Sequence, residues 1–268
     1  MAATSPNPAE TYESYMVPGL FAPCAARLIE AVAPPSWDRV LDVACGTGIV
    51  ARHAASHTDS GGTVTGLDIS PDMLEVARSR AAEQRLTIAW HEGRAEALPF
   101  PDGAFDLVTC QFGLMFFTDR QAALAEMHRI LTPDGWLVLN VFQGIDRHPF
   151  YGRLDKVIRD RFGISGVGDI FALGDIGQLQ ALVMDAGFGK VDIQPFDIDA
   201  RFPAPGAFLA GEIAVDTAAI PEMQHLDATA RAEMVNAIAG DMQDAMREVT
   251  DGDHIVMPFH VLILRAAS

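Results

Sequence analysis

The stretch Val40–Val50 reads V-L-D-V-A-C-G-T-G-I-V, and the stretch Thr63–Met73 reads T-V-T-G-L-D-I-S-P-D-M. The first begins with a short β-branched apolar run, typical of a buried parallel strand, and continues through a glycine turn into a helical pattern. The second repeats the strand pattern and ends at Asp68, twenty residues after Gly48. These two segments therefore predict two neighbouring strands with a glycine turn and a carboxylate at the same edge of a sheet.

This pair of segments predicts a cofactor site. Gly46 and Gly48 permit a tight turn and allow a ligand to approach bare backbone. The helix that follows presents free N–H groups and the positive end of its dipole to an anionic group. A carboxylate at Asp68 can accept both hydroxyls of a ribose, so the site is expected to bind a cofactor that contains adenosine. Nicotinamide-binding folds share these features, so the remaining motifs have to decide which cofactor is bound.

Three further segments indicate which cofactor is bound: H-E-G-R-A-E-A-L-P-F at 91–100, P-D-G-A-F-D-L-V-T-C-Q-F at 101–112 and L-T-P-D-G-W-L-V-L-N at 131–140. In combination with the glycine turn and Asp68, they resemble the class I S-adenosylmethionine-dependent methyltransferases. The resemblance is strongest to the branch that includes ubiquinone and menaquinone biosynthesis methyltransferases and many small-molecule enzymes. It covers roughly residues 12–142 and thins to overall layout afterwards.

The resemblance implies S-adenosylmethionine as the cofactor and S-adenosylhomocysteine as the product, with Asp68 on the ribose and Ile69 on the adenine. The residues it assigns to cofactor binding are Asp42, Ala44, Gly46, Gly48, Asp68, Ile69, Met73, Ala95, Glu96 and Gln111. One position departs from the family, which usually has Asp after Gly93 to accept from the adenine amino group. Arg94 stands there and cannot accept a hydrogen bond, so Glu96, backbone or packing is expected to hold the adenine.

Composition narrows the class of protein. The 268 residues are 49% hydrophobic and carry a net charge of −17, so a large core is expected and nucleic-acid partners are disfavoured by repulsion. The C-Q-F-G exit at 110–113 also differs from the Asn-Pro-Pro-Tyr type used on nucleobase amines. The sequence shows no signal peptide and no membrane span, and its three cysteines are read as reduced core thiols, so a cytoplasmic protein is expected.

The alternation of strand and helix patterns predicts a Rossmann-like α/β fold, a doubly wound, seven-stranded, mostly parallel sheet whose last strand is antiparallel. We expect one methyltransferase domain over residues 1–268, with an N-terminal cap helix at 1–33 and helical insertions at 144–174 and 203–252 forming a substrate lid. The expected strands lie near 39–43, 63–68, 86–91, 105–111, 136–142, 190–199 and 259–264.

Ligands bind at the carboxyl ends of the strands in such a sheet, so the acceptor pocket is expected there. Its predicted wall is largely apolar and aromatic and consists of Tyr12, Tyr15, Met16, Phe112, Met115 and Phe116. His148 is the first histidine after the fifth strand and is the predicted general base. No pattern calls for a metal, and the oligomeric state is not readable.

The expected reaction is transfer of a methyl group to a small apolar or aromatic metabolite, with a hydroxyl oxygen favoured as the acceptor atom. Methylation of carbon or nitrogen remains open, because all three nucleophiles use this scaffold. Two other classes also remain: an NAD-dependent oxidoreductase, which would require a second nucleotide-binding half, and a non-catalytic cofactor-binding protein, which would lack turnover.

Overall fold

The computed structural model describes residues 7–32, 37–58 and 61–268, and in these residues an eight-stranded sheet forms the centre of the molecule. Its main path has the order β3-β2-β1-β4-β5-β8-β6, and β7 pairs with β8 off this path. The strands are β1 (Arg39–Val43), β2 (Thr63–Asp68), β3 (Ala89–Glu92), β4 (Phe105–Gln111), β5 (Leu131–Phe142), β6 (Val191–Pro203), β7 (Thr250–Asp251) and β8 (His254–Ala267).

The sheet is parallel from β3 to β5, and β8 runs antiparallel to both β5 and β6. The predicted Rossmann-like class, with its antiparallel last strand, is therefore confirmed. The chain passes from β1 outward to β2 and β3, then returns to the other side of β1 with β4. Such a reversal opens a crevice at the carboxyl ends of the two central strands. This crevice is where the candidate site lies.

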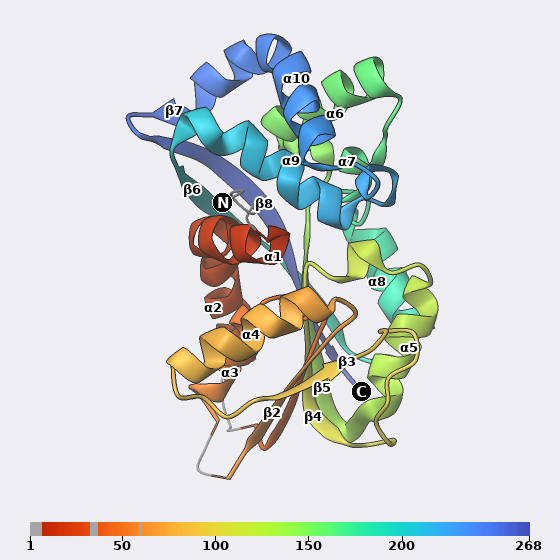
Figure 1. Cartoon of the computed structure of the whole chain (residues 1–268). Coiled ribbons are helices and arrows are strands. Elements are labelled where there is room, and N and C mark those ends of the chain that lie inside the picture. The colour runs from red at the N-terminus through yellow and green to blue at the C-terminus, as the bar shows by residue number, and fades with distance from the viewer. Residues whose placement is uncertain (1–6, 33–36, 59–60) are drawn as a thin grey trace.

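Helices cover both faces of the sheet, with α2, α3 and α4 on one face and α5 and α8 on the other (Figure 1). Side chains at Ser70, Asp119 and Asp175 accept backbone N–H groups at the starts of α4, α5 and α8, which explains where these helices begin. The helices are α1 (Pro8–Thr11), α2 (Ala22–Glu30), α3 (Ile49–Ala55), α4 (Pro71–Glu83), α5 (Arg120–Ile130), α6 (Pro149–Phe162), α7 (Gly166–Asp169), α8 (Ile176–Asp185), α9 (Phe208–Ala219) and α10 (Ala228–Val249).

A π-helix, Tyr12–Phe21, joins α1 to α2, so the predicted N-terminal cap is helical through the part that the structure describes. Residues 1–6 and 33 of the predicted cap lie outside the described residues. Pro18 sits inside this π-helix, where its missing N–H removes one helical hydrogen bond. Gly19 lets the segment press against β6, because a Cβ there would lie 2.6 Å from the carbonyl oxygen of Arg201.

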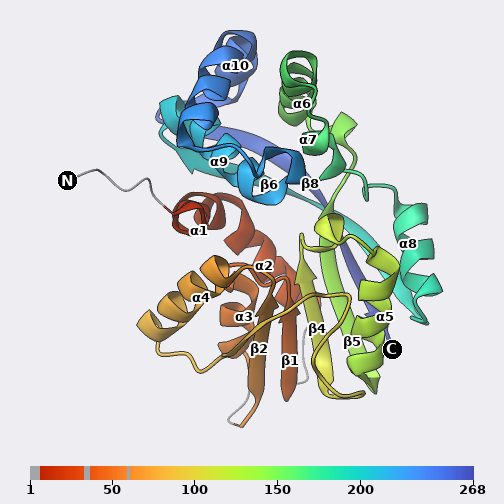
Figure 2. The same cartoon turned by 45° about the vertical axis from the view of Figure 1, so that its right-hand side comes forward.

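The helices α6, α9 and α10 gather beyond the carboxyl ends of the parallel strands (Figure 2). Helix α6 follows β5, whereas α9 and α10 lie between β6 and β8, whose antiparallel pairing continues from Val191 with Ala266 to Pro203 with His254. Both strands are longer than expected from the sequence. Helix α1 contacts both α4 and α9, so the N-terminal segment lies between the parallel half and these outer helices. No helix among the described residues has the length and apolar character needed to cross a membrane.

Candidate functional site

The glycine turn after β1 forms one wall of the site. Ala44 and Gly46 have φ angles of 55° and 54°, in the left-handed region that an alanine enters only at an energetic cost. The Gly46 N–H donates to Oδ2 of Asp68 at 2.8 Å, which ties the turn to the end of β2. The turn therefore presents backbone, with little side chain, toward the crevice.

Asp68 has the geometry expected of a carboxylate that receives hydroxyl donors. Its Oδ1 accepts from the Ser70 N–H at 2.9 Å, and its side chain lines the cavity although the residue is only 8% exposed. Burial raises the pKa of Asp68, and the N–H groups of Ser70 and Gly46 oppose that rise. A carboxylate has about four acceptor positions, so after these two bonds the oxygens can still accept two hydroxyls.

An apolar surface and an ion pair flank Asp68. Ile69 is 57% exposed, which is unusual for so large an apolar side chain, and it lines the cavity. Glu96 accepts from the Thr118 N–H at 3.1 Å through Oε1, and the same oxygen pairs with Arg94 at 3.4 Å. Arg94 is itself more than half exposed, so its guanidinium is directed toward Glu96 and solvent.

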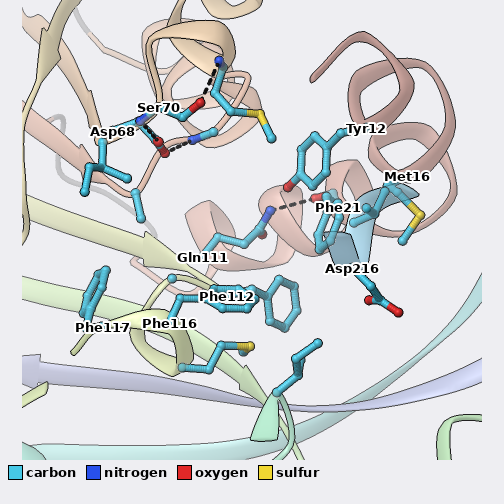
Figure 3. A pocket seen from close by; sticks show the side chains of 18 of the residues that line it. Tyr12, Met16, Phe21, Asp68, Ser70, Gln111, Phe112, Phe116, Phe117 and Asp216 are labelled. Atoms are coloured by element: carbon cyan, nitrogen blue, oxygen red, sulfur yellow. Dashed lines mark hydrogen bonds between the residues drawn. The ribbon is translucent and has the colours of Figure 1, made fainter. Parts of the chain in front are cut away.

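These groups border a cavity of about 430 Å³, which Figure 3 shows from close by. Most of the side chains predicted for the site lie in its wall. Those brought together are Tyr12, Met16, Ala44, Gly46, Asp68, Ile69, Met73, Ala95, Glu96, Gln111, Phe112, Met115 and Phe116. Asp68 lies on one side of the cavity and Asp216, which comes from α9, lies on the opposite side (Figure 3).

The N-terminal π-helix covers the cavity with aromatic side chains. Tyr12 stacks on Phe21 with ring centroids 5.0 Å apart, and Phe21 packs in turn on Phe112 at 5.6 Å. Gln111 fixes this cover from below, because its Nε2 donates to the Phe21 carbonyl oxygen at 3.1 Å. Burial, with a smaller contribution from Asp68, raises the pKa of Tyr12, so its phenol stays protonated.

The far end of the cavity is aromatic. Phe112, at the exit of β4, has a φ of 51° and stacks on Phe142 at the end of β5, with ring centroids 4.1 Å apart. Phe142 contacts Phe171 and Phe259 at centroid distances of 5.5 and 5.4 Å. Two residues in left-handed backbone, Ala44 and Phe112, therefore end two adjacent strands at this site, a clustering of strain that is common at functional sites.

Two residues predicted to bind the cofactor lie behind the wall. Asp42 is 1% exposed and accepts from the Thr109 hydroxyl at 2.9 Å and the Ala51 N–H at 3.1 Å, so it braces the turn from beneath. Gly48 faces away from the cavity, because a Cβ at this position would lie 2.4 Å from Trp90. The missing side chain of Gly48 makes room for the indole of Trp90 in β3, and its role in cofactor binding stays a prediction.

The structure also corrects the placement of Tyr15 and His148. The Tyr15 hydroxyl donates to the Pro203 carbonyl at 3.2 Å and its ring stacks on Phe202, outside the cavity wall. His148 is 2% exposed and outside the wall; its Nε2 accepts from the His260 N–H at 3.1 Å and its Nδ1 lies 3.1 Å from the Gly144 carbonyl. Burial lowers the pKa of His148. With both nitrogens bonded to backbone, it has none free for an acceptor's proton.

The sequence analysis did not predict three ionisable side chains in the wall: Tyr151 from α6, and Glu212 and Asp216 from α9. The signal was present, because two acids four residues apart interrupt the apolar helix F-L-A-G-E-I-A-V-D-T-A-A at 208–219. The methionines of the same region, Met223, Met234 and Met242, are buried in helix packing and do not line the cavity.

A methyltransferase family model and two relatives named as methyltransferases match this chain. A family model described as a methyltransferase domain matches residues 41–139. A demethylmenaquinone methyltransferase of Thermus thermophilus is 35% identical over 184 residues, which are 69% of this chain and 76% of that protein. A ubiquinone/menaquinone biosynthesis C-methyltransferase UbiE of Chromobacterium violaceum is 36% identical over 169 residues, 58% of this chain and 68% of the relative.

Solved structures agree in fold. The YcgJ protein of Bacillus subtilis superposes with a TM-score of 0.60 at 20% identity, over 90% of this chain and 96% of that one. A phosphoethanolamine N-methyltransferase 2 of Haemonchus contortus, solved with phosphomonomethylethanolamine and S-adenosylhomocysteine, gives a TM-score of 0.56 at 18% identity, over 92% of this chain and 52% of that one. At these identities the likeness concerns the fold alone.

Proposed function

Because the chain belongs to the class I S-adenosylmethionine-dependent methyltransferases, we propose that it methylates a hydroxyl oxygen of a small, flat, apolar or aromatic metabolite. Enzyme class and cofactor follow from the family. The acceptor and its reacting atom are the proposal, and the observation that carries it is the aromatic far end of the cavity.

The polar end of the cavity fits the cofactor. Asp68 retains acceptor positions for ribose hydroxyls, Ile69 offers an exposed apolar surface for adenine, and the Gly46 turn leaves room for a chain to lie along backbone. When bound, S-adenosylmethionine supplies a methyl group on a sulfonium, which is a good leaving group. Glu96 and Met73 complete the wall on this side.

The aromatic end fits a flat acceptor. Phe112 and Phe142 stack nearly parallel, with an interplanar angle of 17°, and Phe171, Phe259 and Tyr151 close the space around them. Because these two rings are in contact with each other, they present an aromatic surface on which one face of a planar ring can stack, and the apolar side chains around it exclude water. We propose that residues 144–174 and 203–252, which include α6 and α9, form the acceptor side of the site and select its substrate.

The protein promotes the reaction mainly by aligning the acceptor with the methyl group of the cofactor. Holding an acceptor oxygen in line with the methyl carbon can supply about 7–11 kcal/mol of barrier reduction when the geometry is right. The stacked rings fix the plane of an acceptor, and the cover made by Tyr12 and Phe21 separates the reacting atoms from solvent. No step of this alignment requires His148.

Methylation of a ring carbon is the second candidate. The similarity to proteins named C-methyltransferases, 36% identical in the case of the relative from Chromobacterium violaceum, favours it. A phenol that loses its proton can react at oxygen or at a ring carbon, so the same cavity serves both outcomes.

The experiment is a screen with methyl-labelled S-adenosylmethionine against phenols, hydroxylated quinones and amines, with product structures from mass spectrometry and proton NMR. A methoxy product from a phenolic acceptor supports the proposal, and a C-methyl product shifts it to the second candidate. Turnover of amines alone overturns both. Calorimetry provides a separate check: S-adenosylhomocysteine binds and NAD does not.

A further inference from the structure

Helix α9 brings two carboxylates to the aromatic end of the cavity. Glu212 and Asp216 lie one helical turn apart, line the cavity, and are only 2% and 5% exposed. Neither was assigned a role by the resemblance to methyltransferases. Acidic side chains are rarely buried to this extent unless they are paired, so their presence in an apolar wall requires an explanation.

The hydrogen bonding of this pair is incomplete. Glu212 Oε2 accepts from the Tyr151 hydroxyl at 3.0 Å. Glu212 Oε1 and Asp216 Oδ2 are buried and have no partner within the described part of the chain. A buried acceptor without a donor costs free energy that a donor supplied by a ligand would recover. The two free oxygens therefore point to a ligand group that carries a proton.

The pair also has no cation beside it in the described wall. Arg94 is the one Arg, Lys or His among the described lining residues, and it belongs to the polar end, where it pairs with Glu96. The titratable groups that face the pair are phenols: Tyr151 from α6, which donates to Glu212, and Tyr15 from the π-helix, whose pKa the charge of Glu212 also raises. Neither neutralises a carboxylate.

We propose that Glu212 and Asp216 together accept the proton of the methyl acceptor, an inference that rests on the proposed hydroxyl function. The acceptor's O–H bond breaks and its proton passes to a free carboxylate oxygen. The oxygen's electron pair forms the bond to the methyl carbon, and sulfur keeps the pair of the broken S–C bond and becomes a neutral thioether. The carboxyl later returns the proton to water.

Electrostatics favours this role over the binding of an ammonium group. The bound cofactor already places a sulfonium cation in the same cavity, and a second cation there would be repelled in a low-dielectric site. A neutral hydroxyl that becomes anionic is attracted instead. Burial, together with the charge of Asp216, raises the pKa of Glu212, and burial raises that of Asp216, which brings both toward neutral pH, where a general base works best.

The first test uses Glu212→Gln, Asp216→Asn and the double variant on an acceptor found in the screen. Loss of a general base costs about 100- to 10,000-fold in rate, so kcat should fall by that factor in the double variant. The rising limb of the kcat–pH profile should disappear, and affinity for S-adenosylhomocysteine should stay within about threefold. Glu222→Gln, which removes an exposed carboxylate nearby, is the matched control and should leave kcat unchanged.

The second test needs no acceptor. In the wild type, the folded state holds protons on the pair that the unfolded chain releases above about pH 4, so stability should fall as pH rises from there through the raised pKa values. The double variant should lose this fall while the Glu222→Gln control keeps it. Thermal unfolding at a series of pH values measures both.

The outcomes separate the two proposals. Hydroxyl methylation that survives in the double variant within about threefold overturns the carboxylate pair as base and leaves the proposed function intact. A wild type that methylates only amines overturns the function and the base with it. Superimposable stability–pH curves for wild type and double variant show that the pair does not titrate as required, and this too overturns the inference.

Discussion

The two ends of the cavity are built in different ways. At the cofactor end, a carboxylate is held by backbone: Asp68 receives the N–H groups of Gly46 and Ser70 and sits at the end of a parallel strand. At the aromatic end, where we propose that the acceptor binds, Glu212 and Asp216 project from a helix into the wall, and each has one oxygen without a partner in the described structure. The orientation of Asp68 is set by backbone hydrogen bonds, so it stays the same whichever ligand binds. Side chains that project from a helix can be substituted one at a time without altering the backbone.

The strongest test of this contrast is at Gly48, where backbone geometry leaves no room for a side chain. Gly48→Ala should lower the free energy of unfolding by roughly 2–5 kcal/mol, because the left-handed φ of 83° and contact with Trp90 both oppose a Cβ. Chemical denaturation measures the loss. Gly103→Ala is the control, since it also has positive φ but open space, and only about 1–2 kcal/mol is expected. Equal losses of unfolding free energy in the two variants would show that contact with Trp90 does not contribute to the effect at Gly48.

Asp68 tests the same end through cofactor affinity. We expect Asp68 to accept two charge-assisted hydrogen bonds from the ribose, so Asp68→Ala should weaken S-adenosylhomocysteine binding by roughly 2–4 kcal/mol, or about 30- to 700-fold in Kd. Calorimetry on this variant and on Asp68→Asn, which preserves shape, separates loss of charge from disturbance of the Gly46 turn. Asp72→Ala, on the exposed first turn of α4, should bind normally. An unchanged Kd in Asp68→Ala would remove the basis for the ribose contact.

His148 tests the aromatic end, because the sequence predicts it as a general base and the structure places it outside the cavity wall. His148→Ala should leave turnover within about threefold and lower stability by about 1–3 kcal/mol, since the His260 N–H loses its acceptor and the Gly144 carbonyl keeps only the Arg147 N–H as a donor. Because burial lowers its pKa, the folded state keeps this histidine neutral while the unfolded chain takes a proton below about pH 6.5. Wild-type stability should therefore decline as pH drops through that value, opposite in sign to the carboxylate pair. A large loss of kcat would restore His148 as a base.

The smallest effect is expected at Arg94, the departure from the family pattern. Its ion pair with Glu96 is more than half exposed on the arginine side, and pairs of this kind contribute little. Arg94→Ala should change the Kd for S-adenosylhomocysteine by less than about threefold. A tenfold weakening would instead indicate that the guanidinium stacks on the adenine.

Local patterns predicted the cofactor end well. The expected strands at 39–43, 63–68 and 105–111 match β1, β2 and β4, because short β-branched runs between turn residues have few alternatives in a buried sheet. Strand β5 was expected from 136 but begins at Leu131. The Pro133-Asp134-Gly135 segment forms a bulge within β5. Phe105 pairs with Leu131 and Leu107 pairs with Trp136, so β5 has extra residues between two pairs that are close together on β4.

Tertiary placement explains what the sequence did not predict. The side chains of Glu212 and Asp216 reach the cavity only because β6 and β8 carry α9 across the carboxyl ends of strands far away in the chain. His148 follows the right strand, yet its ring turns into backbone contacts with β8. Chain position predicts which edge of the sheet a residue approaches, whereas the direction of its side chain depends on partners that periodicity does not reveal.

The pairing of Pro203 with His254 has an evolutionary consequence. Everything between them, including α9 and α10, leaves and re-enters the sheet at neighbouring positions, so the segment 204–253 is a hairpin insertion on an antiparallel ribbon. Ancestral or laboratory recombination can replace such a segment without shifting the register of the parallel strands that hold the cofactor. Under the proposed function, exchange of this one segment would change the acceptor that is methylated and would leave the methyl donor site in place.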